Sequence, residues 1–153
     1  MRLNDPVAEI RRTRTIAADP QTIWDVLADF GAVSSWADFV DHSCLLSPHD
    51  QRIGIGTARR VQVGRNTLVE RITEFSPPLS LRYDVEGFPR WLMVRNGWTL
   101  TPSGGATDVT LISAVTVAGL PGPIAENLIA RVSAKRVDAM LACLAKQLEA
   151  QHV

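Results

Sequence analysis

The sequence predicts an α+β fold in which a curved antiparallel sheet of about seven strands wraps around one long C-terminal helix. Three observations lead to this prediction. Segments with strand-like alternation follow one another with only short turns between them, which is typical of antiparallel sheets. One or two short helices follow the first strand, and the chain ends in its longest helical segment. A sheet of this kind buries its apolar face most simply by curling around that last helix.

The N-terminal part of the chain predicts a strand and two short helices. Ile10–Ala18 mixes arginine and threonine with apolar residues and is predicted to be a strand. Asp19 is a suitable helix N-cap and Pro20 suits the first helical position, so Pro20–Asp29 is predicted to be an amphipathic helix. Ala32–Ala37 is predicted to be a second short helix or turn that closes part of the structure.

The middle of the sequence alternates with a period of two and is divided by turn residues. A polar loop at Pro48–Gly56 and a Gly64–Thr67 turn cluster are the clearest divisions. The predicted strands are Phe39–Ser47, Thr57–Val63, Leu68–Phe75, Leu81–Val85, Leu92–Thr101 and Asp108–Ala118.

The last predicted element is a helix from Ile124 to about Ala150, without glycine or proline. Apolar residues recur along it at helical spacing and predict a single stripe that faces the sheet. The stripe consists of Ile124, Leu128, Val132, Met140, Leu144 and Leu148.

Composition limits the classes of function. The 153 residues include 46% hydrophobic residues, which indicates one globular domain spanning residues 1–153. Sixteen basic residues balance sixteen acidic ones, so a nucleic-acid partner is not expected. No apolar run is long enough for a membrane-spanning helix, and no secretory signal is recognisable, so a cytoplasmic location is expected. Cys44 and Cys143 are expected to be free thiols, and no metal or cofactor is predicted.

Several stretches together resemble the SRPBCC superfamily (START-like, Bet v 1-like), in particular its polyketide cyclase/dehydrase-like branch. They include residues 14–20 leading into 23–30, Trp36, Gly54–Thr57, residues 69–79 and Gly97–Leu100, followed by the C-terminal helix. The resemblance implies a helix-grip fold, with a cavity between the concave face of the sheet and the last helix. It also implies that the short second helix and the strand-connecting loops gate that cavity.

Arg59 and Glu70 are the first candidates for polar groups inside the cavity. A two-residue turn at Arg65-Asn66 would place Val61 opposite Glu70, and Arg59 and Glu70 would then be diagonal neighbours on one face. If that face points inward, the pair could hold a ligand oxygen, or Glu70 could act as a base. A register slip of one residue would instead place both charges in water.

Tyr83, Asn96 and Ser113 are further polar candidates on inward faces. The phenol of Tyr83 could donate a hydrogen bond to a ligand carbonyl, or it could be a core tyrosine bonded to backbone. Arg136 could enter the cavity or extend to its rim. The complete predicted ligand-binding set is Trp36, Phe39, Arg59, Val61, Glu70, Ile72, Tyr83, Asn96, Trp98, Leu111, Ser113, Leu128, Val132 and Arg136, of which Glu70, Arg59 and Tyr83 are also the catalytic candidates.

Aromatic residues near turns suggest a gate for an apolar ligand. Trp36 is predicted to belong to this gate, together with Phe39 and Phe88, and Trp91 is ambiguous. Trp24 and Trp98, in regular elements, are predicted to lie in the core. The three histidines show no metal-ligand spacing and are expected to be solvated.

The leading functional hypothesis is a binding module: a carrier or sensor for an apolar, partly oxygenated small molecule such as a lipid, polyketide or quinone. The chain would then act as a monomer or homodimer, with transient membrane contact at the aromatic lip. An enzyme of the cyclase, aromatase or dehydratase type is the alternative, and it needs at least two polar groups converging in the cavity. A third possibility is a domain that docks onto a protein partner, which requires a large apolar patch outside the cavity.

Overall fold

The computed structural model describes residues 8–46, 52–119 and 122–151. Its elements are β1 (Ala8–Ile16), α1 (Pro20–Ala28), the 3₁₀ helix η1 (Phe30–Ser35), β2 (His42–Leu45), β3 (Ala58–Val63), β4 (Asn66–Ser76), β5 (Ser80–Glu86), β6 (Leu92–Ser103), β7 (Ala106–Val117) and α2 (Pro123–Gln151). The seven strands form one antiparallel sheet in the order β1-β7-β6-β5-β4-β3-β2. The predicted fold class is therefore confirmed.

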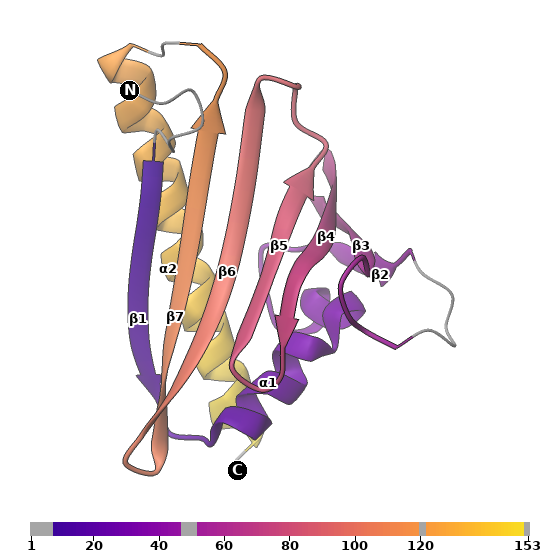
Figure 1. Ribbon diagram of the computed structural model, residues 1–153, viewed down its shortest axis with the longest axis vertical. Coiled ribbons are helices and arrows are strands. Elements are labelled where there is room, and N and C mark those ends of the chain that lie inside the picture. The colour runs from indigo at the N-terminus through magenta and orange to yellow at the C-terminus, as the bar shows by residue number, and fades with distance from the viewer. Residues whose placement is uncertain (1–7, 47–51, 120–121, 152–153) are drawn as a thin grey trace.

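The sheet curves across one side of α2, and α1 and η1 lie at one end of the molecule (Figure 1). The α2 helix begins at the opposite end, where the β5–β6 connection also lies, and runs down toward α1. None of the described helices combines the length and apolar character needed to cross a membrane.

The start of α1 follows the N-cap prediction. The Asp19 carboxylate accepts a hydrogen bond of 2.8 Å from the backbone N–H of Thr22, and Pro20 occupies the first turn, where no backbone donor is required. Trp24 and neighbouring apolar side chains of α1 are buried, and the Trp24 ring packs against Phe75 with 5.2 Å between ring centroids. This contact fixes α1 beneath one end of the sheet.

Several boundaries differ from the sequence prediction: β1 begins and ends two residues earlier, η1 also begins and ends two residues earlier, and β2 is shorter. β2 has only four residues, so Phe39 and Val40 precede it instead of belonging to it. The segment from 36 to 41 turns back toward the core after η1, with Trp36 and Ala37 bonded to the Val33 carbonyl. The predicted loop at Pro48–Gly56 lies partly outside the described residues, and only its part from Arg52 is described.

The β3–β4 turn also differs from the prediction. It consists of Gly64 and Arg65, so Val63 pairs with Asn66 and Arg59 lies directly opposite Glu70. Gly64 has φ +60, a backbone conformation that suits glycine at the first central position of a two-residue hairpin turn. The register is therefore shifted by two residues from the predicted one. A shift of two keeps each side chain on the same face, so the predicted facing of Arg59 and Glu70 is unchanged.

The core of the molecule occupies the end of the sheet near α1. Side chains of α1, η1 and the C-terminal half of α2 pack there against the sheet, and Trp98 and Leu144 are among the most completely buried. In α2 the buried residues are Val137, Met140, Leu141, Leu144, Ala145 and Leu148.

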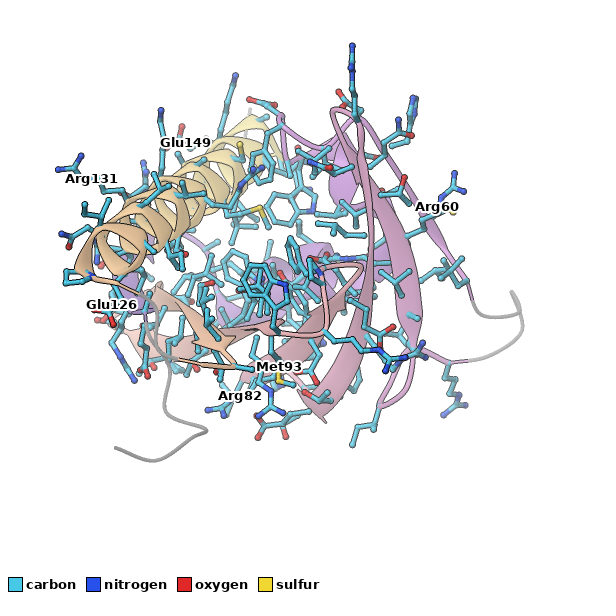
Figure 2. The ribbon with its side chains drawn as sticks, turned by 90° about the horizontal axis from the view of Figure 1, so that it is seen from above. Arg60, Arg82, Met93, Glu126, Arg131 and Glu149 are labelled. Carbon is cyan, nitrogen blue, oxygen red and sulfur yellow. The ribbon has the colours of Figure 1, made fainter. Side chains whose placement is uncertain are left out.

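The predicted apolar stripe of α2 is therefore only half packed. Ile124, Leu128 and Val132 continue it toward the N-terminus of the helix, but their exposed fractions are 86%, 62% and 56%. The helix and sheet do not close on each other in this half of the molecule. Figure 2, seen from above, shows that the labelled charged side chains Glu126 and Arg131 of α2 point away from the interior, as do Arg82 and Met93 on the outer face of the sheet.

Candidate functional site

A cavity of about 450 Å³ lies between the inner face of the sheet and the N-terminal half of α2. Strands β3 to β7 form most of its wall, residues around η1 contribute Val33, Phe39 and Val40, and α2 forms the remaining side. Leu128 and Val132 both line the cavity and are exposed, as is Phe88, so the cavity opens to the surface between α2 and the β5–β6 connection. Its volume lies within the range of small-molecule sites.

Most of the predicted ligand-binding residues line this cavity. Those that do are Phe39, Arg59, Val61, Glu70, Tyr83, Asn96, Leu111, Ser113, Leu128, Val132 and Arg136. Three do not. Trp36, Ile72 and Trp98 are buried in the core behind the lining.

The prediction that Trp36 belongs to the gate is wrong, because its side chain is buried. Its ring meets that of Trp98 edge-on, with 6.3 Å between centroids, because the segment after η1 folds inward and does not project at the mouth. The indole Nε1 of Trp36 is buried without a hydrogen-bond partner among the described residues. Trp36 therefore supports the closed end of the molecule, whereas Phe39 does line the cavity.

The strand register places three polar side chains in one row across the sheet. Tyr83 of β5 lies opposite Asn96 of β6, and Asn96 lies opposite Ser113 of β7. Opposed side chains on one face of a sheet are about 5 Å apart at Cβ, so these three form a continuous polar strip, called here the polar row. All three line the cavity.

Apolar rows flank the polar row on both sides. Toward α1, the next row is formed by Leu81, Trp98 and Leu111, which are buried in the core. Toward the mouth, the next row consists of valines: Val85, Val94 and Val115. Glu70 extends this valine row onto β4, and Arg59 extends it onto β3.

Arg59 and Glu70 form a buried ion pair beside the polar row. The Arg59 Nε donates to Glu70 Oε1 at 2.8 Å, and Nη2 lies 2.8 Å from the same oxygen. The Arg59 Nη1 donates to the backbone carbonyl of Phe30 at 2.9 Å, and the guanidinium stacks 3.8 Å from the centre of the Phe30 ring. Protein groups therefore contact all three guanidinium nitrogens of Arg59 and one face of the group. The main effect of Arg59 is to tie β3 to η1 and to fix the orientation of the Glu70 carboxylate.

The buried positive charge of Arg59 is compensated by the carboxylate of Glu70. The arginine side chain is 4% exposed and that of Glu70 is 13% exposed. Removing one member of a buried pair leaves an uncompensated charge, which typically costs about 3–5 kcal/mol of stability. The pair is thus an integral part of the cavity wall, not a surface contact.

Tyr83 is neutral at physiological pH. Burial, followed by the nearby negative charge of Glu70, raises its pKa from 10.0 to about 12, although Arg59 and hydrogen bonds with the side chains of Trp98 and Asn96 oppose this shift. Its ring packs edge-on against Phe30 at 5.7 Å. The phenol can therefore donate a hydrogen bond to a ligand oxygen, but it is not suited to act as a base.

Arg136 marks the rim of the cavity. Its guanidinium lies over the ring of Phe39, 4.6 Å from the ring centre, and the residue is exposed. Among the described residues, no group of three or more His, Cys, Asp or Glu side chains is arranged to hold a metal ion.

Sequence reasoning missed several lining residues. Val85 and Val94 share the inward alternation of Tyr83 and Asn96, so the period of two could have identified them. Val115 shares the inward face of Ser113 on its strand and could have been assigned to the site on the same ground. Asn66, Phe88 and Ser133 carry no such signal, because their positions depend on the turn geometry and on how far α2 stands from the sheet.

Comparisons with known proteins agree with this architecture. Residues 7–149 match the family described as polyketide cyclase / dehydrase and lipid transport. The chain belongs to this family. A comparison with curated protein sequences found no significant match. The family match confirms the resemblance seen in the sequence and, with the cavity, supports a small-molecule-binding fold.

Solved structures with the same fold come from several bacteria. A START superfamily protein from Mycobacterium smegmatis has a TM-score of 0.76 at 15% identity, covering 94% of this chain and 98% of that one. The Zhui aromatase/cyclase from Streptomyces sp. R1128 has a TM-score of 0.77 at 19% identity, covering 95% of both chains. A protein from Thermus thermophilus, TTHA0849, has a TM-score of 0.74 at 19% identity, covering 95% of this chain and 99% of that one. At these identities the likeness shows the fold alone.

Proposed function

We propose that this protein binds and carries an apolar, partly oxygenated small molecule, such as a lipid, polyketide or quinone, in the cavity between the sheet and α2. The observation that carries the proposal is the cavity itself: about 450 Å³, open at one end and lined mainly by aliphatic and aromatic side chains. Enclosing an apolar ligand there removes its surface from water, at about 25 cal/mol per Å². The family to which the chain belongs includes lipid transport in its description, which supports the same interpretation.

Filling the cavity tests this proposal. Val94 lies in the valine row and lines the cavity, so Val94→Phe should occupy ligand space. We expect the affinity for N-phenylnaphthylamine, an uncharged dye whose fluorescence increases in apolar surroundings, to fall at least about tenfold, because the inserted ring occupies the volume that the dye requires. Fluorescence titration of the purified protein measures this change.

The neighbouring residue provides a matched control. Met93 is exposed on the outer face of the same strand, so Met93→Phe adds the same ring without entering the cavity. This variant should bind the dye like the wild type. Equal dye binding by Val94→Phe and the wild type would overturn the proposal.

The second candidate function is an enzyme of the cyclase, aromatase or dehydratase type. The buried Arg59–Glu70 pair beside Tyr83 favours it, because ionisable groups converge inside the cavity. In this case Glu70 is the proton acceptor, and Tyr83 donates a hydrogen bond to a substrate carbonyl.

Replacement of the Glu70 carboxylate distinguishes the two candidate functions, carrier and enzyme. If Glu70 is the base, Glu70→Gln should reduce turnover of an accepted polyketide substrate at least about a hundredfold. Turnover can be followed by chromatography of the products. Tyr83→Phe is the comparison variant: it removes a donor but no base, so its effect should be smaller. Unchanged turnover in Glu70→Gln would remove the proposed base.

A role in docking to a protein partner has less support. The outer face of the sheet carries exposed ion pairs, Arg82–Glu74 and Arg95–Asp84. The exposed apolar side chains Trp91, Ile124 and Leu128 belong to the β5–β6 connection and to the first half of α2, between which the cavity opens. This distribution supports transient contact of the cavity mouth with a membrane. We further propose action in the cytoplasm, as a single domain, in a monomer or homodimer.

A further inference from the structure

The inner part of the cavity contains two hydrogen-bond acceptors that the protein does not use. Both Arg59 contacts go to Oε1 of Glu70, and no described residue donates to Oε2. The side-chain oxygen Oδ1 of Asn96 is buried and has no partner among the described residues either. Both residues line the cavity. The Asn96 oxygen is the buried one, and buried acceptors are almost always satisfied in folded proteins, which indicates that a bound molecule supplies its donor.

The charges at this depth are already balanced. Arg59, Glu70 and Arg136 are the charged residues that line the cavity within the described part of the chain. Arg59 is neutralised by Glu70, and Arg136 lies at the exposed rim against Phe39. A carboxylate or phosphate placed beside the polar row would therefore face the Glu70 carboxylate with no free cation to compensate it. The inner end favours an uncharged polar group.

The rows of the sheet also define a direction for the ligand. The polar row lies on the inner side, next to the packed core, and Glu70 lies one row nearer the mouth; most of the other side chains that line the cavity toward the mouth are aliphatic or aromatic. A molecule with one polar end can place that end against the polar row and its apolar part against the apolar lining only if the polar end enters the cavity first. Its apolar body then lies along Val85, Val94 and Leu128.

We propose that the ligand carries an uncharged hydroxyl group, as in a phenol, enol or alcohol, and binds with this group innermost, donating to Glu70 Oε2 or Asn96 Oδ1. This inference rests on the proposed function, since it specifies the ligand class of the same cavity. Tyr83, which stays protonated, can donate to the oxygen of the same hydroxyl group. The hydroxyl group thus both donates and accepts. An ether or a quinone carbonyl can only accept, and it leaves both acceptors unsatisfied.

Three ligands that differ in one group test the proposal: β-naphthol, its methyl ether, and β-naphthoate, each titrated into the wild-type protein by calorimetry. We expect β-naphthol to bind about tenfold more tightly than the methyl ether, because only the naphthol can donate to Asn96 Oδ1 or Glu70 Oε2. We expect β-naphthoate to bind more weakly than the naphthol, because of its charge. Equal affinities for the naphthol and the ether would overturn the proposal while leaving the proposed function intact. If none of the three binds, the proposed function fails as well.

A pair of asparagine variants then locates the effect. Asn96→Leu removes one unused acceptor at nearly constant volume, so the preference for β-naphthol over its ether should fall severalfold. Asn127→Leu makes the same exchange at an exposed position of α2 that does not line the cavity, and should retain the preference. Retention of the full preference in Asn96→Leu would contradict the assignment of that residue. Should this variant fail to fold, the wild-type comparison of the three ligands still decides the proposal.

Discussion

The single tyrosine of this chain, Tyr83, has surroundings that no sequence pattern specifies. It is fully buried, Phe30 contacts the edge of its ring, and the Arg59 guanidinium lies 5.0 Å from its ring centre. Glu70 adds a negative charge nearby. Desolvation and this charge both disfavour the phenolate, so the hydroxyl remains a donor over the whole physiological range.

A spectroscopic titration checks this directly, because Tyr83 gives the only phenolate signal. In the folded protein the phenolate absorbance should develop with a midpoint near pH 12, against 10.0 for the unfolded chain. The folded state therefore retains its proton where the unfolded state loses it, and the free energy of unfolding should decrease as the pH rises from about 10 toward 12. The urea-unfolded protein is the control. A midpoint near 10 in the folded protein would contradict the burial of this phenol.

The Arg59–Glu70 pair shows which part of a site the sequence can predict. Alternation along β3 and β4 places both residues on the same face, whatever the error in the turn, but it left open whether that face points inward. Their direct opposition, and the bond from Arg59 to the Phe30 carbonyl, were not predictable. They depend on the choice of Gly64 as the first turn residue and on the position of η1 after folding.

At the scale of elements, α2 consists of two halves with different surroundings. From Val137 onward its apolar side chains are buried against the sheet, whereas Leu128 and Val132 face the cavity and remain exposed. The sequence predicted one continuous stripe, because helical periodicity reports which residues share a face and not what that face contacts. The distance between α2 and the sheet is set by tertiary packing, so the periodicity of the helix alone does not predict it.

This difference should be measurable by hydrogen exchange. We expect backbone amides of residues 127–133 to exchange at least about tenfold faster than those of residues 140–148, because local opening of the first half exposes little packed surface. Saturation with N-phenylnaphthylamine should slow exchange in the first segment and leave the second almost unchanged, which provides the internal control. Uniform protection along α2 would show that the helix opens as one unit.

At the scale of the whole molecule, the order and type of the elements were predictable because the signals are local. Asp19-Pro20 begins α1, Gly64 and Gly104-Gly105 mark hairpin turns, and alternation identifies the strands between them. The cavity was implied by the family resemblance, and its depth and mouth were not predictable from these signals. They arise from sheet curvature and from the burial of Trp36 and Trp98 at one end, where contacts join residues far apart in the chain.

The confinement of the packed core to one end of the sheet has a consequence for protein engineering. Each of the strands β5, β6 and β7 contributes to stability near α1 and to the ligand cavity near the mouth, only two to four residues apart. Substitutions at Val85, Val94 or Val115 can reshape the ligand space while the tightly packed rows beneath them keep the scaffold folded. A library confined to the valine row is therefore a practical starting point for redirecting this scaffold to new molecules.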